Sequence, residues 1–364
     1  MKKIIFFLIF ISIQKSFAQL STIEIWKDSV IGAIYNKKSA SVAYGKKDSK
    51  GYYKIFISDS LGNNEKQLTF PGWRSDRHQW AEEWYPSGEY LFCIVEKDDY
   101  VKEKKGHKRA PVDAIPGYGA YSDLWIISRD GTRAWKLTNL PNTYKSGIIH
   151  CAISDDGTKF GWSERIGAPK FTDMNLAAGS YVFRIADFIL PKSLGGNSVT
   201  DSVPNFANIK TYQPGNVDGC NELESFSKDN KSIAFYSTFE TKHLFRTPIY
   251  TMNLETGEIN RLTTESFAQA PVFTPDGKRI VYMTGHECAI FPFEVQGADW
   301  WIMNADGTEK KRITFMNVKD HVQSVNHYRL AGSISMISNN SFFGGVMIKP
   351  LGLTGYTVKV TFYE

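Results

Sequence analysis

Histidine is the residue type in this sequence that most directly predicts acid–base chemistry. Imidazole titrates near neutral pH, so histidine serves as a general base and as the commonest metal ligand. His78 and His150 stand at or before the starts of two neighbouring strand patterns, and we expect them side by side, with either one as the base. For any single histidine, a structural role fits the sequence as well as a catalytic role. The full set is His78, His107, His150, His243, His286, His321 and His327.

Tyrosines and arginines near these histidines complete a predicted acid–base site at one rim of the molecule. Tyr118 and Tyr121 close a long insertion at 96–122, and one of them is predicted to supply the acid. Arg74 and Arg165 bracket the same corner and are predicted to clamp a substrate carboxylate, because a guanidinium binds a planar anion through two bonds. Trp80 fits a packing role between sheets as well as a stacking role under a sugar ring. Further predicted substrate contacts are Lys105, His107 and Glu222.

These residue types favour elimination beside a carboxylate on a sugar. Such a reaction needs a base for the proton at C5, a cation for the carboxylate and an acid for the leaving oxygen. The predicted function is therefore a carbon–oxygen lyase, either a polysaccharide lyase or an oligosaccharide dehydratase, whose partner is an anionic, uronate-containing oligosaccharide or polysaccharide. A glycoside hydrolase is the first alternative, since hydrolysis needs two carboxylates roughly 5–10 Å apart. Candidate carboxylates are Glu82, Glu83, Glu164, Glu222 and Glu224.

A non-enzymatic binding or scaffold protein is the second alternative. Two enzyme signatures are missing from the sequence, namely G-x-S-x-G and H-E-x-x-H. Their absence removes the peptidases that join a propeller to an α/β-hydrolase domain, and it removes the helical zinc proteases. The segment that begins at His286 and Glu287 lacks the second histidine of the zinc motif.

A repeated pattern of short strands must position these residues. Its clearest copy runs through 249–257, 261–263 and 270–282, as a strand, a Thr-Gly turn, an Arg-Leu-Thr segment and two strands around Pro-Asp-Gly. Self-similarity of this kind predicts a closed array of small antiparallel sheets. The predicted fold is all-β, a six-bladed β-propeller of four-stranded antiparallel blades.

Turn residues give the count of six blades. A blade needs roughly 40–50 residues. Two of the spacings between successive first turns are longer than this, and each is explained by one blade with an insertion. We expect 356–362 to be the outermost strand of the last blade. Turns between the first and second strands are predicted near Ser39, Gly88, Gly157, Asn230, Gly277 and Gly332. Turns between the third and fourth strands are predicted near Gly62, Gly131, Asp187, Gly257, Gly307 and Gly352.

The repeat resembles that of the TolB-type propeller family. Trp301-Ile-Met-Asn-Ala-Asp-Gly307, followed by Lys311-Arg-Ile-Thr314, matches the family pattern almost letter for letter. The resemblance covers nearly the whole mature chain and implies the fold, whereas propellers of this kind serve as docking platforms, protease subdomains and sugar-cleaving enzymes. More loosely, the chain is similar to the oligogalacturonate lyases, which hold a divalent metal with histidines and a glutamine. His321, Gln323 and His327 resemble that set with a different spacing, so a divalent metal is left open as a cofactor.

The amino-terminal residues predict export. Lys2 and Lys3 precede an apolar run, and Ser16-Phe17-Ala18 has the small-x-small form of a cleavage site, so 1–18 is predicted to be a signal peptide. The remaining 19–364 is predicted to be one propeller domain, a soluble monomer in the periplasm or outside the cell. No membrane span is predicted, because no apolar run approaches the roughly 20 residues that a span requires.

Charge and cysteine content narrow the function further. Three of the 43 basic residues lie in the predicted leader, which leaves 40 against 38 acidic residues. A chain so close to neutrality lacks the concentrated positive field that nucleic-acid binding needs. Cys93 and Cys151 are predicted to be buried thiols, whereas Cys220 and Cys288 fall in predicted loops and could pair.

Overall fold

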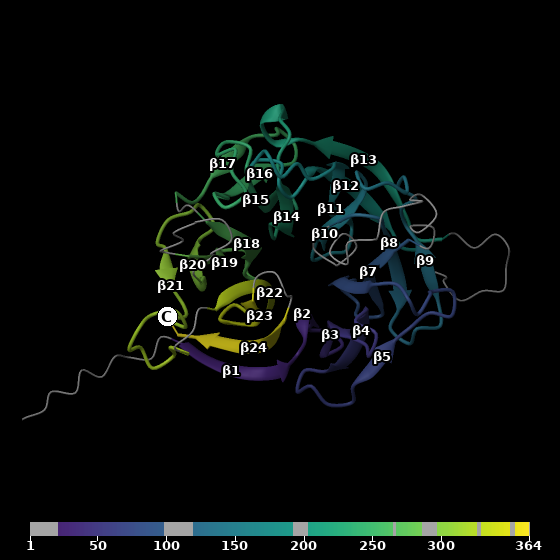
Figure 1. Ribbon diagram of the computed structural model, residues 1–364, viewed down its shortest axis with the longest axis horizontal. Helices are drawn as coiled ribbons and strands as arrows, with labels where there is room; N and C mark the ends of the chain where they lie inside the picture. Colours follow the sequence, from purple (N-terminus) through teal and green to yellow (C-terminus); the bar gives the residue numbers. More distant parts are fainter. Residues whose placement is uncertain are drawn as a thin grey trace, which may run out of the picture.

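The computed structural model shows six four-stranded antiparallel sheets arranged around a central channel (Figure 1). This confirms the predicted six-bladed β-propeller. The structure describes residues 21–97, 119–191, 203–264, 267–285, 297–325, 329–349 and 354–363. Within these ranges, no helix is long and apolar enough to cross a membrane.

Each blade presents its strands in order from the channel outward. The innermost strands are β2 (Ile31–Asn36), β6 (Gln79–Trp84), β10 (Gly147–Ile153), β14 (Asn221–Phe226), β18 (Ala268–Phe273) and β22 (Leu330–Ser338). The second strands are β3 (Ser41–Lys47), β7 (Tyr90–Glu96), β11 (Lys159–Gly167), β15 (Ser232–Ser237), β19 (Arg279–Thr284) and β23 (Ser341–Lys349). The third strands are β4 (Tyr53–Asp59), β8 (Ser122–Ser128), β12 (Ser180–Ile189), β16 (Ile249–Asn253), β20 (Asp299–Asn304) and β24 (Thr354–Phe362).

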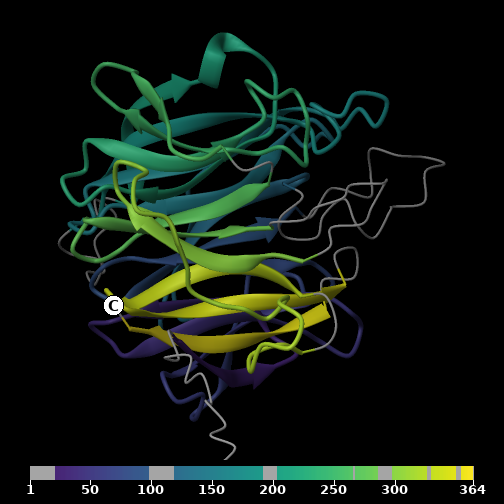
Figure 2. The same cartoon turned by 90° about the vertical axis from the view of Figure 1, so that its left-hand side faces the viewer.

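The outermost strands differ in length and in origin. They are β5 (Lys66–Leu68), β9 (Ala134–Lys136), β13 (Asn205–Tyr212), β17 (Ile259–Arg261), β21 (Lys311–Arg312) and β1 (Ser21–Asp28). The last of these comes from the opposite end of the chain, because β1 pairs with β24 in blade six. Figure 2 shows the first and last strands of the chain side by side at this closure.

The prediction for blade six was therefore wrong by one strand. The segment 356–362 belongs to β24, the third strand, and β1 covers its outer edge with Ser21 opposite Phe362. Gly332 lies inside β22, and the first turn of this blade instead joins Ser338 to Ser341. The four-strand pattern of a blade was matched to the carboxyl-terminal residues alone, although the ring takes one strand from the amino-terminal side.

The repeated turn motif is held by side-chain hydrogen bonds. The motif occurs in four turns, each of which follows the first or the third strand of a blade. In each turn a Ser or Thr hydroxyl donates to the carboxylate of an Asp two residues later, and a backbone N–H after the turn donates to the same carboxylate. Such local bonds fix the tight turn that a hairpin needs. The pairs are Ser128–Asp130, Ser154–Asp156, Ser227–Asp229 and Thr274–Asp276.

The Leu-Thr segment of the repeat has an equally specific task. The Thr263 hydroxyl accepts the Ile249 backbone N–H at 2.9 Å, so the segment after the fourth strand is tied to the start of the third. Thr138 does the same for Leu124, and Thr314 for Trp300. Because a buried N–H without a partner is costly, this bond explains why threonine recurs at this place in the repeat.

Candidate functional site

A cavity of about 510 Å³ fills the central channel and is lined by residues from all six innermost strands. Its wall is uneven. Blades two, three and four contribute Glu82, Glu83, His150, Glu222 and Glu224, and blades six and one contribute several small residues together with larger ones such as Tyr35, Lys37 and Met336. The small residues on that opposite wall include Gly32, Ala33, Gly332, Ser333 and Gly345.

Breaks in strand register bring these side chains into the channel. All six innermost strands contain a bulge or irregularity where they pair with the second strand. In β6 it falls between Ala81 and Glu83, and in β14 between Leu223 and Ser225. A bulge adds a residue to one strand and re-aims the side chains around it. Glu82 and Glu224 are the added residues in these two strands.

His150 lies between two carboxylates from neighbouring blades. Its Nδ1 is 3.0 Å from Oε2 of Glu82, and its Nε2 is 3.4 Å from Oε2 of Glu224. The Glu82 side chain is only 2% exposed and also accepts the Cys151 backbone N–H at 3.2 Å. The His150 side chain keeps 27% of its surface exposed, so its imidazole remains open to the cavity.

Two further glutamates extend the cluster. Glu222 accepts a hydrogen bond from the phenolic hydroxyl of Tyr236, which stands on the second strand of the same blade. Glu83 follows Glu82 in β6, and its Oε1 accepts the Trp84 backbone N–H at 2.9 Å. We use the name channel cluster for Glu82, Glu83, His150, Glu222, Glu224 and Tyr236.

Burial and mutual charge spread the pKa values of this cluster. Burial raises the pKa of Glu83 to about 7 and that of Glu224 to about 8, and it also raises the pKa of Glu82 and Glu222. Burial alone would lower the pKa of His150, but Glu224, Glu82 and Glu222 outweigh it and raise that pKa to about 10. Because the charge of Glu224 is the largest cause that raises the pKa of His150, these two groups titrate together, and the pair retains protons to higher pH than free side chains would. Glu83 is near half ionisation at neutral pH.

This arrangement can both donate and accept a proton at pH 7. Titratable groups whose environments push their pKa values apart are the usual way to place an acid and a base in one site. Glu224 can donate, ionised Glu83 can accept, and the imidazolium of His150 can stabilise negative charge.

His78, the other predicted base, lies between blades one and two. Its side chain is buried, and its Nδ1 accepts the Tyr53 backbone N–H at 3.0 Å. Its own backbone N–H donates to Glu96 at 2.8 Å. The described residues that line the channel cavity include His150 and not His78, and His150 faces Glu82 instead.

The predicted carboxylate clamps and acid lie away from the channel cavity. Arg74 is exposed and bonds the carboxylate of Asp76 through two nitrogens, at 2.8 and 2.7 Å. Arg165 is buried with its guanidinium 4.8 Å from the centre of the Tyr144 ring. Tyr121 is buried too, at a backbone φ of 54°.

Trp80 has the packing role that the sequence allowed, whereas stacking under a sugar ring stays a prediction. It lines the channel cavity, and it also packs against blade one. A Cβ atom added to Gly45 would meet its ring at 2.5 Å, and one added to Gly32 would meet it at 2.6 Å. These glycines therefore make the space that the indole occupies. Tyr118, Lys105, His107, His286, Cys288 and His327 lie outside the described residues.

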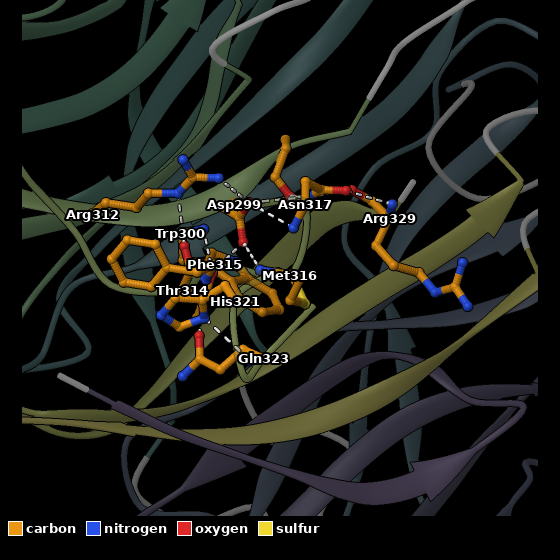
Figure 3. A network of polar contacts seen from close by, with 11 residues as sticks. Asp299, Trp300, Arg312, Thr314, Phe315, Met316, Asn317, His321, Gln323 and Arg329 are labelled. Carbon is orange, nitrogen blue, oxygen red and sulfur yellow. Dashed lines mark hydrogen bonds and ion pairs between the residues drawn. The ribbon is translucent and has the colours of Figure 1, made fainter. Parts of the chain in front are cut away.

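The remaining described histidines contact the chain around them. Nδ1 of His243 accepts the Phe245 backbone N–H at 3.2 Å. His321 stacks on Phe315 with ring centres 4.4 Å apart, beside the hydrogen-bonded network around Asp299 (Figure 3). Cys93, Cys151 and Cys220 are buried free thiols, which confirms the prediction for the first two.

Of the residues that resemble a metal-binding set, the structure describes His321 and Gln323, and both bond to backbone groups of the chain. Oε1 of Gln323 accepts the Phe315 backbone N–H at 2.9 Å (Figure 3). Its Nε2 donates to Ser21 at 2.9 Å. Nδ1 of His321 accepts the Gln323 backbone N–H at 3.1 Å. Among the residues that the structure describes, no group of three or more His, Cys, Asp or Glu side chains is arranged to hold a metal ion.

Sequence reasoning named most of this cluster but divided it between two hypotheses. His150 was a candidate base for elimination, Glu82, Glu83 and Glu224 were candidates for hydrolysis, and Glu222 was named both as a substrate contact and as a candidate for hydrolysis. Tyr236 was missed, and its only sequence signal is a tyrosine on the strand that pairs with Glu222. Glu164 lies elsewhere, paired with Arg184 at 2.9 Å.

Fold and site together define a six-bladed propeller with an acid–base cluster in its channel. No family model matches the sequence, and no curated protein matches it. Among solved structures, the chain is similar to TolB from Acinetobacter baumannii, with 14% identity and a TM-score of 0.50, over 90% of this chain and 65% of the length of that TolB.

Two other similar structures have different activities in their names. One is an oligogalacturonate lyase in complex with manganese, with 13% identity and a TM-score of 0.47, over 94% of this chain and 91% of that one. The other is a puromycin-hydrolyzing peptidase from Mycobacterium tuberculosis, with 13% identity and a TM-score of 0.48, over 91% of this chain and 43% of that one. At such identities the likeness concerns the fold alone, which is that of the TolB-type propellers, as predicted.

Proposed function

We propose that this chain is an exported enzyme that cleaves a carbon–oxygen bond of a saccharide at the channel cluster. The observation that supports the proposal most is the pair Glu224 and Glu83, whose pKa values are raised to about 8 and about 7 in the wall of the cavity that also holds His150. A cavity of about 510 Å³ lies within the usual size of a ligand pocket, roughly 300–1,000 Å³.

The first candidate reaction is elimination on a uronate unit, the reaction of a carbon–oxygen lyase. The imidazolium of His150 would pair with the sugar carboxylate and so acidify the proton at C5. Glu83 would accept that proton while a double bond forms between C4 and C5. Glu224 would protonate the oxygen that leaves C4, so atoms and electrons balance without a metal or a cofactor.

The second candidate reaction is hydrolysis of a glycosidic bond. Elimination was predicted to use Arg74 and Arg165 as clamps for the substrate carboxylate. Neither arginine is among the described residues that line the channel cavity, and this favours hydrolysis, which needs no such clamp. A protonated carboxyl group with an ionised partner is the arrangement that glycoside hydrolases use. In this reaction water would attack the anomeric carbon and give its proton to the ionised Glu83, while Glu224 protonates the leaving oxygen.

One assay distinguishes these reactions from simple binding. Purified protein is incubated with uronate-containing and neutral oligosaccharides while near-ultraviolet absorbance and new reducing ends are recorded. Elimination produces a conjugated double bond that absorbs, whereas hydrolysis produces reducing ends without absorbance. Turnover of neither substrate set would contradict an enzymatic function and favour the scaffold alternative.

Matched variants connect the activity to the channel cluster. Glu224→Gln keeps the size of the side chain but cannot donate the same proton, so we expect the rate to fall by at least about 100-fold. His150→Ala is expected to cost about the same factor. Glu164→Gln changes a carboxylate paired with Arg184 outside the cavity and serves as the control. Full activity in both channel variants would place the reaction elsewhere.

Export is part of the same proposal. Residues 1–18 read as a leader, and β1 begins at Ser21, close after the predicted cleavage site. Mass spectrometry of the exported protein is expected to find Gln19 at the amino terminus. Retention of the apolar leader in an inner-membrane fraction would contradict this proposal.

A further inference from the structure

A second cavity, of about 320 Å³, lies between blades one and two. It is separate from the channel cavity, with which it shares no lining residue. Its wall is formed by the loop between β3 and β4, by Lys54 of β4, by the segment between β5 and β6, and by Gln79. The loop residues include Asp48, Ser49 and Lys50, and those of the segment include Thr69, Phe70, Trp73 and Ser75.

Lys54 is the first unusual feature of this cavity. The residue is 3% exposed, and its Nζ donates to the Arg77 carbonyl oxygen at 2.5 Å. The ammonium also lies 5.6 Å from the centre of the Tyr52 ring. Among the described residues, no carboxylate forms an ion pair with it. Burial lowers the pKa of Lys54, and Asp48, Glu96 and Asp76 oppose this effect from beyond ion-pair distance. An ammonium with only distant counter-charges can still pair with an anion supplied from outside.

Two polar atoms without partners are the second feature. Nε1 of Trp73 and Oε1 of Gln79 are buried and have no hydrogen-bond partner in the described structure. One is a donor and the other an acceptor, and buried polar atoms of this kind are rarely left unsatisfied. A ligand hydroxyl both donates and accepts, so it can satisfy either atom.

Aromatic rings form the third feature. Phe70 and Trp73 both line the cavity, with ring centres 6.1 Å apart at an angle of 72°. The aromatic wall matches the apolar face of a sugar ring, whereas the polar atoms match its hydroxyl groups. The volume of about 320 Å³ lies at the lower end of ligand pockets and suits a single sugar unit.

We propose that this cavity binds one carboxylated pyranose unit of a saccharide, with Lys54 facing the carboxylate, Trp73 and Phe70 beside the ring, and Gln79 bonded to a hydroxyl. The site is for binding and not for catalysis. It does not depend on the reaction at the channel cluster, so it stands if the proposed enzymatic function fails.

The test follows the indole N–H of Trp73 by nuclear magnetic resonance. The resonance is identified as the one that disappears in Trp73→Phe, a variant that keeps an aromatic ring but removes the donor. The probe is methyl β-D-glucuronide, compared with methyl β-D-glucoside, which lacks the carboxylate, and with acetate and inorganic phosphate, which lack the ring. We expect a saturable shift with the glucuronide and an affinity for the glucoside about tenfold lower.

Variants separate the roles of charge and ring. Lys54→Met keeps the length of the side chain, and we expect it to lower glucuronide affinity about tenfold while leaving glucoside affinity unchanged. Lys46→Met, on the neighbouring strand β3 and outside the cavity, is the matched control and should change nothing. If Lys54→Met does not fold, as judged by its thermal unfolding, the comparison of glucuronide with glucoside in the unaltered protein still decides the charge preference.

Four outcomes would overturn the proposal. They are equal affinity for glucuronide and glucoside, an unchanged glucuronide affinity in Lys54→Met, acetate or phosphate binding as tightly as the glucuronide, and the absence of any shift at Trp73. The third outcome would identify a general anion site. The last would leave only ordered water beside Trp73 and Gln79.

Discussion

Each carboxylate around His150 binds its proton more tightly in the folded chain than in the unfolded chain, and so does the histidine itself. The pKa of Glu224 rises from 4.5 to about 8, and that of His150 from 6.5 to about 10. Where the folded state binds more protons, stability falls as pH rises. The contribution of Glu224 is therefore present below pH 4.5 and lost by pH 8, and that of His150 is present below pH 6.5 and lost by pH 10.

The first prediction concerns this loss of stability. The free energy of unfolding should fall between pH 6 and pH 9, and Glu224→Gln should flatten the part of the curve below pH 8. We expect the variant to gain on the order of 1–2 kcal/mol relative to the parent at pH 8.5, since a neutral amide avoids burying a charge. Urea denaturation at several pH values measures this, with Glu164→Gln as the control. Parallel curves for parent and Glu224→Gln would show that the Glu224 pKa is not raised.

The second prediction concerns the pH dependence of activity. Glu83 must be ionised to accept a proton, and Glu224 must be protonated to donate one, so kcat should be highest between pH 7 and pH 8. The rate should fall about tenfold for each unit below pH 6 or above pH 9. Glu224→Gln should abolish the fall on the alkaline side. A rate that keeps rising above pH 9 would assign the acid to another group.

At this scale the sequence predicted residue types better than their positions. It named five members of the channel cluster, because histidines and glutamates recur near the starts of the innermost strands. It did not distinguish His78 from His150, which occupy similar places in neighbouring repeats. His78 precedes its strand and bonds to Tyr53, whereas His150 lies within β10 next to a bulge. A bulge leaves no recognisable mark in a sequence, and a shift of one residue reverses the face that every following side chain occupies.

Each blade is stabilised by contacts of residue types that recur in the sequence repeat. The turn pairs and the recurring threonine were visible in the sequence as Asp-Gly and Leu-Thr, and the structure gives the reason for each. Around Asp299, the same threonine belongs to a larger network (Figure 3). The Asp299 carboxylate accepts bonds from the Thr314 hydroxyl, the Met316 backbone N–H and the Arg312 guanidinium.

The third prediction compares two of these threonines. Thr263→Val removes the acceptor of the Ile249 N–H at nearly unchanged volume, and we expect a loss of about 1–3 kcal/mol. Thr314→Val also removes a donor to the buried Asp299, so its loss should be greater by about 1 kcal/mol. Thr361→Val on β24, outside these loops, is the control. Equal losses at 263 and 314 would show that Asp299 is satisfied without the threonine.

The whole ring depends on β1, which was the main error of the sequence-based fold. Composition and repeats were sufficient for six blades, but they could not show which end of the chain supplies the last strand. The closure is anchored at several points besides the strand ladder. The Ser21 hydroxyl donates to the Ile313 carbonyl oxygen at 2.6 Å, and the Trp26 indole N–H donates to the Ser60 carbonyl oxygen at 3.0 Å.

The fourth prediction tests this closure. A mature chain without residues 19–28 should lose on the order of 10 °C or more in Tm, because several kcal/mol of pairing and packing are removed at once. Since Ser21 stands opposite Phe362, residues 21–28 attached after Phe362 through a two-residue Asn-Gly turn should form a hairpin and restore the Tm. Calorimetry measures both proteins. A shortened chain that melts like the parent would contradict closure by β1.

Pairing between β1 and β24 also imposes an order on synthesis. A chain that leaves the ribosome amino terminus first can form blade one and its successors in turn, but its first strand has no partner until the last one has been made. Such distant pairing is slow to form, and a waiting strand is open to pairing with another molecule. The charges of Glu24, Lys27 and Asp28 along β1 are the kind that discourage such encounters. The charges of β1 thus discourage wrong pairing during the time before β24 has been made.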